Sequence, residues 1–140
     1  KEYFDDMKIP VPKMSDAEIE LFKAVAEKNG KRIAEILKTG VHPTSKNEKG
    51  ETALMIAADN DDIENVILLL DFGADINAQD NEGMTALMRA VAKDLLFSTE
   101  QLVKAGAKKD IKDKKGRTAL SIAKEVNKRL WAVYANDLTP

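Results

Sequence analysis

The sequence contains no cysteine, which excludes a disulfide framework, a thiol nucleophile and a zinc site built on cysteine. Its single histidine, His42, is too few for most histidine-based metal sites and proton relays. Aromatic residues make up only 5% of the chain, so the core must be built from alanine, leucine, isoleucine and valine. No apolar run approaches the ~20 residues of a membrane-spanning helix, and the longest candidate, Val66 to Leu70, has the length of a core segment.

The chain also lacks a dominant sign of charge. Its 140 residues include 22 lysines and arginines and 24 aspartates and glutamates, which gives a net charge of −2. This near balance provides no electrostatic attraction of the whole molecule for nucleic acid or membrane. With 44% hydrophobic and 33% charged residues, the chain can bury the core of one ordinary domain and remain soluble.

What the chain does contain is an internal repeat with a period of 33 residues. The motif Gly-x-Thr-Ala-Leu begins at Gly50, Gly83 and Gly116. Four series that share one period indicate a repeat architecture, whereas one motif alone would be weak support. The other three series are Gly40, Gly73 and Gly106; Ala24, Ala57, Ala90 and Ala123; and Leu21, Leu54, Leu87 and Leu120.

Each landmark has a physical role in a unit made of two helices and a loop. The threonine of each motif precedes a helical pattern and suits the N-cap, where its hydroxyl accepts a hydrogen bond from a free amide. The alanine three residues after each leucine lies on the same helix face and lets adjacent units approach closely. The glycines of the second series follow apolar stretches and are typical of helix ends in the left-handed conformation. Asn47, Asp80 and Asp113 precede the motif glycines by three residues, so their side chains can close a turn onto the backbone.

This pattern resembles the ankyrin repeat family, whose unit has this length and opens with a Thr-Pro-Leu-His-x-Ala signature. The matching stretches begin at Thr52, Thr85 and Thr118, and the segment from Gly73 to Asp80 resembles the end of the family's unit. The resemblance covers roughly residues 15 to 135 and implies an all-α solenoid of four helix-turn-helix repeats with short β-hairpin-like fingers. The expected organisation is an extended leader at 1–14, an N-capping repeat at 15–46, repeats at 47–79 and 80–112, and a C-capping repeat at 113–140.

The chain departs from the family signature at two positions. Alanine stands in place of the signature proline in all three copies, so the first helical turn is less preorganised. Met55, Met88 and Ser121 stand in place of the signature histidine, so other groups must link neighbouring fingers. The first repeat has no such signature and is predicted to begin at Ser15, which forms a capping box with Glu18.

The third repeat departs most, because the turn between its helices carries Leu95, Leu96 and Phe97 where the family often has a polar turn. These side chains either form an apolar contact patch for a partner or close over the layer between the two helices. Apolar side chains are more often core, which favours the second interpretation. Ser98 is expected to cap the following helix, with Gln101 at capping-box spacing.

The two ends carry weaker signals. Residues 1–14 contain Pro10 and Pro12 and no helical periodicity, so an extended leader is expected, either packed on the first repeat or disordered. The last unit lacks a terminal glycine and ends with Trp131 to Pro140, as a C-terminal cap does. Because the chain begins at Lys1, a cleaved leader and an excised piece of a longer protein both stay open. A cytoplasmic location is expected, with export after leader cleavage as the alternative.

The sequence shows no constellation of catalytic groups. His42 takes the register position of polar residues in the other units and is expected to be a surface loop residue. Asp61 and Asp62 precede an apolar helix and are expected to be N-cap groups, while Asp5 and Asp6 lie in the leader. Neither pair has metal-ligand spacing, and phosphate-binding and nucleophile motifs are absent. The chain is therefore not expected to be an enzyme or to hold a cofactor or metal.

One local charge feature stands out. Between Lys104 and Arg117 there are seven basic residues, and only Asp110 and Asp113 offset them. The finger row is therefore expected to run from mixed or acidic to basic along the stack. This gradient either orients a partner whose charge runs the other way or is a solvated edge that keeps the array soluble.

By its resemblance to ankyrin proteins, the chain is expected to be a monomeric, non-catalytic module that binds a partner protein on the concave surface of its fingers and first helices. The alternative is binding of a polyanion, a nucleic acid or an anionic surface, by the basic last finger, although no aromatic platform accompanies it. The residues expected to contact a partner are Glu48, Lys49, Glu51, Asp59, Asn60, Asn81, Glu82, Met84, Ala92, Lys93, Lys114, Lys115 and Arg117.

Overall fold

The computed structural model describes residues 14–126, and within that range the chain forms seven α-helices. Its only pairing of extended residues there is an isolated antiparallel bridge between Lys46 and Thr52. The expected C-terminal cap from Trp131 to Pro140 and nearly all of the leader lie outside the described residues. The helices are α2 (Asp16–Ala26), α3 (Gly30–Lys38), α4 (Ala53–Asp59), α5 (Ile63–Asp71), α6 (Ala86–Ala92), α7 (Leu96–Lys104) and α8 (Ala119–Val126).

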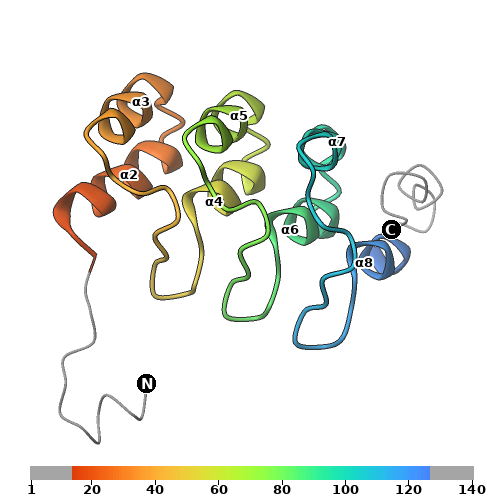
Figure 1. Cartoon of the computed structure of the whole chain (residues 1–140). Coiled ribbons are helices and arrows are strands. Elements are labelled where there is room, and N and C mark those ends of the chain that lie inside the picture. The colour runs from red at the N-terminus through yellow and green to blue at the C-terminus, as the bar shows by residue number, and fades with distance from the viewer. Residues whose placement is uncertain (1–13, 127–140) are drawn as a thin grey trace, which may run out of the picture.

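The helices form a stack of two layers (Figure 1). The first helices of the units, α2, α4, α6 and α8, pack on one another in order, and the second helices α3, α5 and α7 do the same. Three loops project from the same side of this stack. We call them finger 1 (residues 39–52), finger 2 (residues 72–85) and finger 3 (residues 105–118). The predicted all-α solenoid is confirmed.

The starts of the first helices follow the predicted caps. Thr52 Oγ1 accepts a hydrogen bond from the Met55 amide at 3.3 Å, and the threonines of the next two units accept the equivalent bond at the same distance. The predicted capping box of Ser15 and Glu18 is also present, with both of its hydrogen bonds formed. Each first helix therefore begins with its free amides partly satisfied by its own sequence.

Of the caps expected for the second helices, Ser98 is wrong and Asp62 is correct in its position only. Ser98 lies inside α7, where it is fully buried and donates a hydrogen bond to Asp61 Oδ1 of the preceding repeat at 2.6 Å. Asp62 occupies the N-cap position of α5, but its carboxylate accepts from the Asn65 side chain and from no backbone amide. Asp61 has a φ of 53°, in the left-handed region. Packing between repeats decides the partner of Ser98 and Asp61, whereas Asp62 has its partner within its own helix.

The core is a continuous row of aliphatic side chains. Leu54 and Leu87 are each 1% exposed, and the alanines that follow them by three residues, Ala57 and Ala90, are fully buried. In the apolar turn of the third repeat, some side chains pack against the core and one is exposed, so each of the two interpretations fits part of the turn. Leu95 and Leu96 pack partly buried against the core, whereas Phe97 is 67% exposed.

Each finger closes its tip on one acidic or amide side chain, as predicted. Asp80 Oδ1 accepts hydrogen bonds from the amides of Glu82 and Met84, both at 2.9 Å. Asn47 and Asp113 do the same in fingers 1 and 3. The glycine three residues later has a φ between 75° and 80° in all three fingers, a conformation that strongly favours glycine.

Neighbouring fingers are joined by hydrogen bonds that repeat with the 33-residue step. The Asn81 amide donates to the Lys49 carbonyl at 3.1 Å, and the Lys114 amide donates to the Glu82 carbonyl at 3.0 Å. The Gln79 side chain adds a bond from finger 2 to the Lys112 carbonyl of finger 3 at 3.1 Å. These contacts take the linking role for which the sequence, lacking the signature histidine, left no obvious group.

Truncation of the core leucines tests the register. Leu87→Ala is expected to lower the free energy of unfolding by about 2–5 kcal/mol, because it leaves a cavity between α6 and its neighbours. Ile67→Ala, on α5 and 39% exposed, is the control and should cost about 1 kcal/mol or less. Urea unfolding followed by circular dichroism measures both values, and equal costs would show that the register is wrong.

Candidate partner-binding surface

The tips of fingers 1 and 2 and the end of α6 enclose an open groove of about 480 Å³. Both fingers contribute their exposed tips, and α6 contributes one side of its last two turns. The two fingers that line it project from the same side of the stack (Figure 1). It is lined by Glu48, Lys49, Glu51, Asp80, Asn81, Glu82, Met84, Arg89, Ala92 and Lys93.

Most of the residues expected to contact a partner meet in this groove. Asp59 and Asn60 lie at the end of α4, where both are half-buried, and Asp59 reaches the groove through its ion pairs. The three expected contacts of finger 3 do not line the groove. Those that do are Glu48, Lys49, Glu51, Asn81, Glu82, Met84, Ala92 and Lys93.

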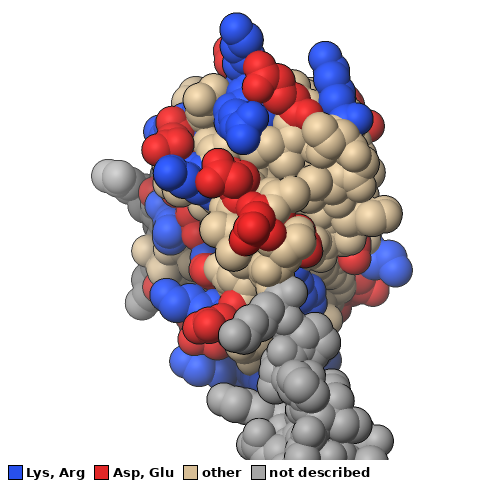
Figure 2. Space-filling model, turned by 90° about the vertical axis from the view of Figure 1, so that its left-hand side faces the viewer, with Lys and Arg blue, Asp and Glu red and all other residues tan. Residues whose placement is uncertain are grey.

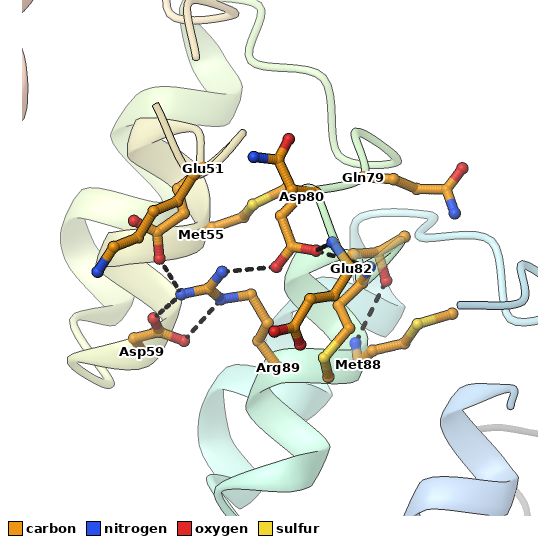
Figure 3. A network of polar contacts seen from close by, with 12 residues as sticks. Glu51, Met55, Asp59, Gln79, Asp80, Glu82, Met88 and Arg89 are labelled. Atoms are coloured by element: carbon orange, nitrogen blue, oxygen red, sulfur yellow. Dashed lines mark hydrogen bonds and ion pairs between the residues drawn. The ribbon is translucent and has the colours of Figure 1, made fainter. Parts of the chain in front are cut away.

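Arg89 organises the groove from its floor (Figure 3). Its guanidinium donates to Asp80 Oδ2 at 2.8 Å, to Glu51 Oε2 at 2.6 Å and to both carboxylate oxygens of Asp59. The four side chains are between 8% and 18% exposed. One arginine of α6 thus ties finger 1, finger 2 and the end of α4 together.

The acidic and basic groups of this network stabilise one another in their charged forms. Burial alone would raise the pKa of Glu51, but hydrogen bonds from Asn47 and Arg89 hold the pKa of this carboxyl below its ordinary value. Burial would lower the pKa of Arg89, yet its hydrogen bonds with Asp59 and Glu51 outweigh burial and raise that pKa. Both groups are therefore charged at neutral pH, and the network is a set of charge-assisted hydrogen bonds.

The sequence contains a signal for Arg89 outside the signature residues. Within the signature stretches, Arg89 takes the position that Ile56 and Ile122 occupy in the neighbouring units. A charged residue at a position that is otherwise isoleucine indicates a polar partner close by. Asp80 was predicted only as a turn residue, and its second oxygen serves the network.

Finger 3 presents a different surface. Arg117 already has partners in the same chain, because its guanidinium forms ion pairs with Asp113 at 2.9 Å and with Glu125 of α8 at 3.0 Å. Burial would raise the pKa of Asp113, but hydrogen bonds from Arg117 and from the Lys115 amide lower it. Lys112, Lys114 and Lys115 are exposed, and no side-chain ion pair joins them to another described residue. The basic character of finger 3 thus rests on its lysines and not on Arg117.

The other end of the stack has no single-sign patch. Figure 2 looks onto the end formed by α2 and α3, where basic and acidic side chains are interleaved. Arg32 of α3, for instance, lies 3.5 Å from Glu35 and 3.9 Å from Glu20. The described residues at this end therefore show no surplus of one charge.

The described residues offer little else of chemical interest. His42 is exposed on finger 1, as expected for a surface loop residue. Within residues 14–126, histidine and acidic side chains form no cluster that could hold a metal ion. No helix in the same range is long and apolar enough to span a membrane.

Comparison with known proteins identifies the family. A family model of ankyrin repeats, in three copies, matches residues 21–113, and the chain therefore belongs to the ankyrin repeat family. No match is found among curated proteins. Ankyrin repeats are generally protein-protein interaction modules and typically non-enzymatic scaffolds.

Removal of Arg89 tests the network. Arg89→Met leaves three carboxylates half-buried without their shared partner, so it is expected to lower the free energy of unfolding by about 3 kcal/mol at neutral pH. Arg32→Met removes an arginine whose side chain is 49% exposed, and it should cost about 1 kcal/mol or less. Urea unfolding at pH 7 measures the two costs, and a similar loss in both variants would contradict the role given to Arg89.

The effect of Arg89→Met on stability is also expected to depend on pH. Because the pKa of Glu51 is lowered in the folded state, its contribution to stability is present above the ordinary value of 4.5 and is lost as the pH falls below it. The stability difference between the wild type and Arg89→Met should therefore shrink between about pH 5 and about pH 3. A difference that stays constant over this range would show that the carboxylates do not act through Arg89.

Proposed function

We propose that the chain is a non-catalytic, monomeric module that binds one partner protein on its finger side. The contact surface consists of the groove between fingers 1 and 2, the end of α6 and the lysines of finger 3. The observation that carries this proposal is the groove itself, which gathers the exposed finger tips and first-helix positions into one concave surface. Concave surfaces built by successive repeats are the binding surfaces of solenoid proteins.

The rigidity of the fingers supports this function. A flexible loop must be ordered when it binds, and this ordering opposes association. Here the finger tips are held by their own turns, by amide bonds from Asn81 and Lys114 to the preceding finger, and by Arg89. The surface is therefore preorganised before a partner arrives.

Position-specific photo-crosslinking tests the proposal. We suggest placing the photoreactive residue p-benzoylphenylalanine at position 49 or 115 on the finger side, and at position 67 or 100 on the second helices as the matched control. Each variant is incubated with an extract of the source cells and irradiated. The finger-side variants should give the same covalently bound protein, and the second-helix variants should not. Adducts from positions 67 and 100 alone would place the binding surface elsewhere.

Binding of a polyanion by Lys112, Lys114 and Lys115 is the alternative. It predicts that the captured species is nucleic acid or an anionic surface, and that capture is lost as NaCl is raised from about 50 mM to about 500 mM. A protein adduct at position 115 that survives this change favours the protein partner.

A further inference from the structure

The groove has an excess of negative charge. Five carboxylates line it or join its network: Glu48, Glu51, Asp59, Asp80 and Glu82. Three cations face them, namely Lys49, Arg89 and Lys93. Two negative charges are therefore unbalanced within a concave surface, where the protein around them limits screening by water.

The internal cations cannot balance these charges. Arg89 already donates four hydrogen bonds to Glu51, Asp59 and Asp80. Lys93 lies 3.5 Å from the same Asp59, and the charge of Lys49 acts on Glu51, so the three cations balance the three inner carboxylates. Glu48 and Glu82, both at the finger tips, form no ion pair with another described residue. The unbalanced carboxylates are thus the exposed ones, at the rim.

The lining of the groove is partly apolar. Met84 of finger 2 and Ala92 of α6 line it, and both are half-buried and continuous with the hydrophobic core. A long aliphatic stem that ends in a cation matches this combination, because the stem can cover apolar surface while its head stays with the carboxylates. Lysine and arginine are the protein side chains with this form.

We propose that the groove receives a lysine or arginine side chain of the partner protein. The stem lies on Met84 and Ala92, and the cationic head lies between Glu48 and Glu82. The neighbouring lysines of finger 3 set the orientation of the bound segment. Acidic residues of that segment would contact Lys114 and Lys115 while its basic side chain occupies the groove. This inference rests on the proposed function and names the chemistry of the segment that is bound.

Peptide selection with the full 140-residue chain tests the inference. A random library of about 12-residue peptides displayed on phage is selected on the wild type, on Glu48→Gln/Glu82→Gln, and on Glu64→Gln/Glu100→Gln. The last variant removes the same two charges from α5 and α7, outside the groove. Arginine and lysine should be enriched in peptides selected on the wild type and on this control, and the enrichment should be lost on Glu48→Gln/Glu82→Gln.

A synthetic peptide from the selection then isolates the charge. The peptide is synthesised in two forms. One form has arginine at the basic position, and the other has citrulline, which has nearly the same shape and no charge. The arginine peptide should bind the wild type about tenfold more tightly, since charge-assisted hydrogen bonds are lost in citrulline. This ratio should approach one on Glu48→Gln/Glu82→Gln. Equal affinities on the wild type would overturn the inference.

The outcomes separate this inference from the proposed function. Peptides without basic enrichment that still shift the amide NMR signals of fingers 1 and 2 would overturn the inference and leave the finger side as the binding surface. Peptides that shift only signals of α5 and α7 would contradict both. Failure to select any peptide on the wild type would also count against both.

Discussion

The apolar face of each helix pair can be buried only against a neighbouring unit, and the rest of the structure depends on this constraint. A unit of 33 residues is too small to enclose its own core, so α2, α4, α6 and α8 must stack. Ala57 and Ala90, both fully buried, allow the close approach that this stacking needs. Because every unit is displaced from the last by the same packing, the loops between units emerge on one side and become a row of fingers (Figure 1).

The fingers extend from the packed helices to the candidate partner-binding surface. An alanine Cβ at Gly83 would lie 2.9 Å from the Lys114 amide, which shows how closely finger 3 approaches finger 2. Gly50 makes the equivalent approach to the amide of Asn81. Arg89 of α6 forms ion pairs with both finger 1 and finger 2, through Glu51 and Asp80. The backbone of the two fingers and the inner carboxylates of the groove are thus held by contacts within the chain.

The sequence predicted those features that depend on residues close together in the chain. The threonine caps, the turns closed by Asn47, Asp80 and Asp113, and the buried leucines each follow from a few neighbouring residues and from the 33-residue register. The partner of Ser98 could not be predicted in the same way, because Asp61 lies 37 residues earlier and meets it only through stacking. The same holds for Lys28, which adopts a φ of 58° at a register position where nothing in its own chemistry favours the left-handed region.

The same distinction between features set by neighbouring residues and features set by stacking applies to the candidate surface. The tips of fingers 1 and 2 could be predicted, since the resemblance to ankyrin repeats assigns contacts to those register positions. The apolar turn could be only half predicted: Leu95 and Leu96 pack against the core as apolar side chains usually do, while Phe97 points outward. Arg89 was missed because its three carboxylates come from three separate segments, and only the stacked structure brings them to one guanidinium.

The groove is preformed only if each finger is rigidly coupled to the next, and hydrogen exchange measures this coupling. The amides of Asn81 and Lys114 donate to the preceding finger, so their exchange in the free protein should be slowed about as much as that of helical amides in α6. Exchange of these two amides at the rate of an unstructured loop, with the helices still protected, would show that the fingers move independently and that the groove is not preformed.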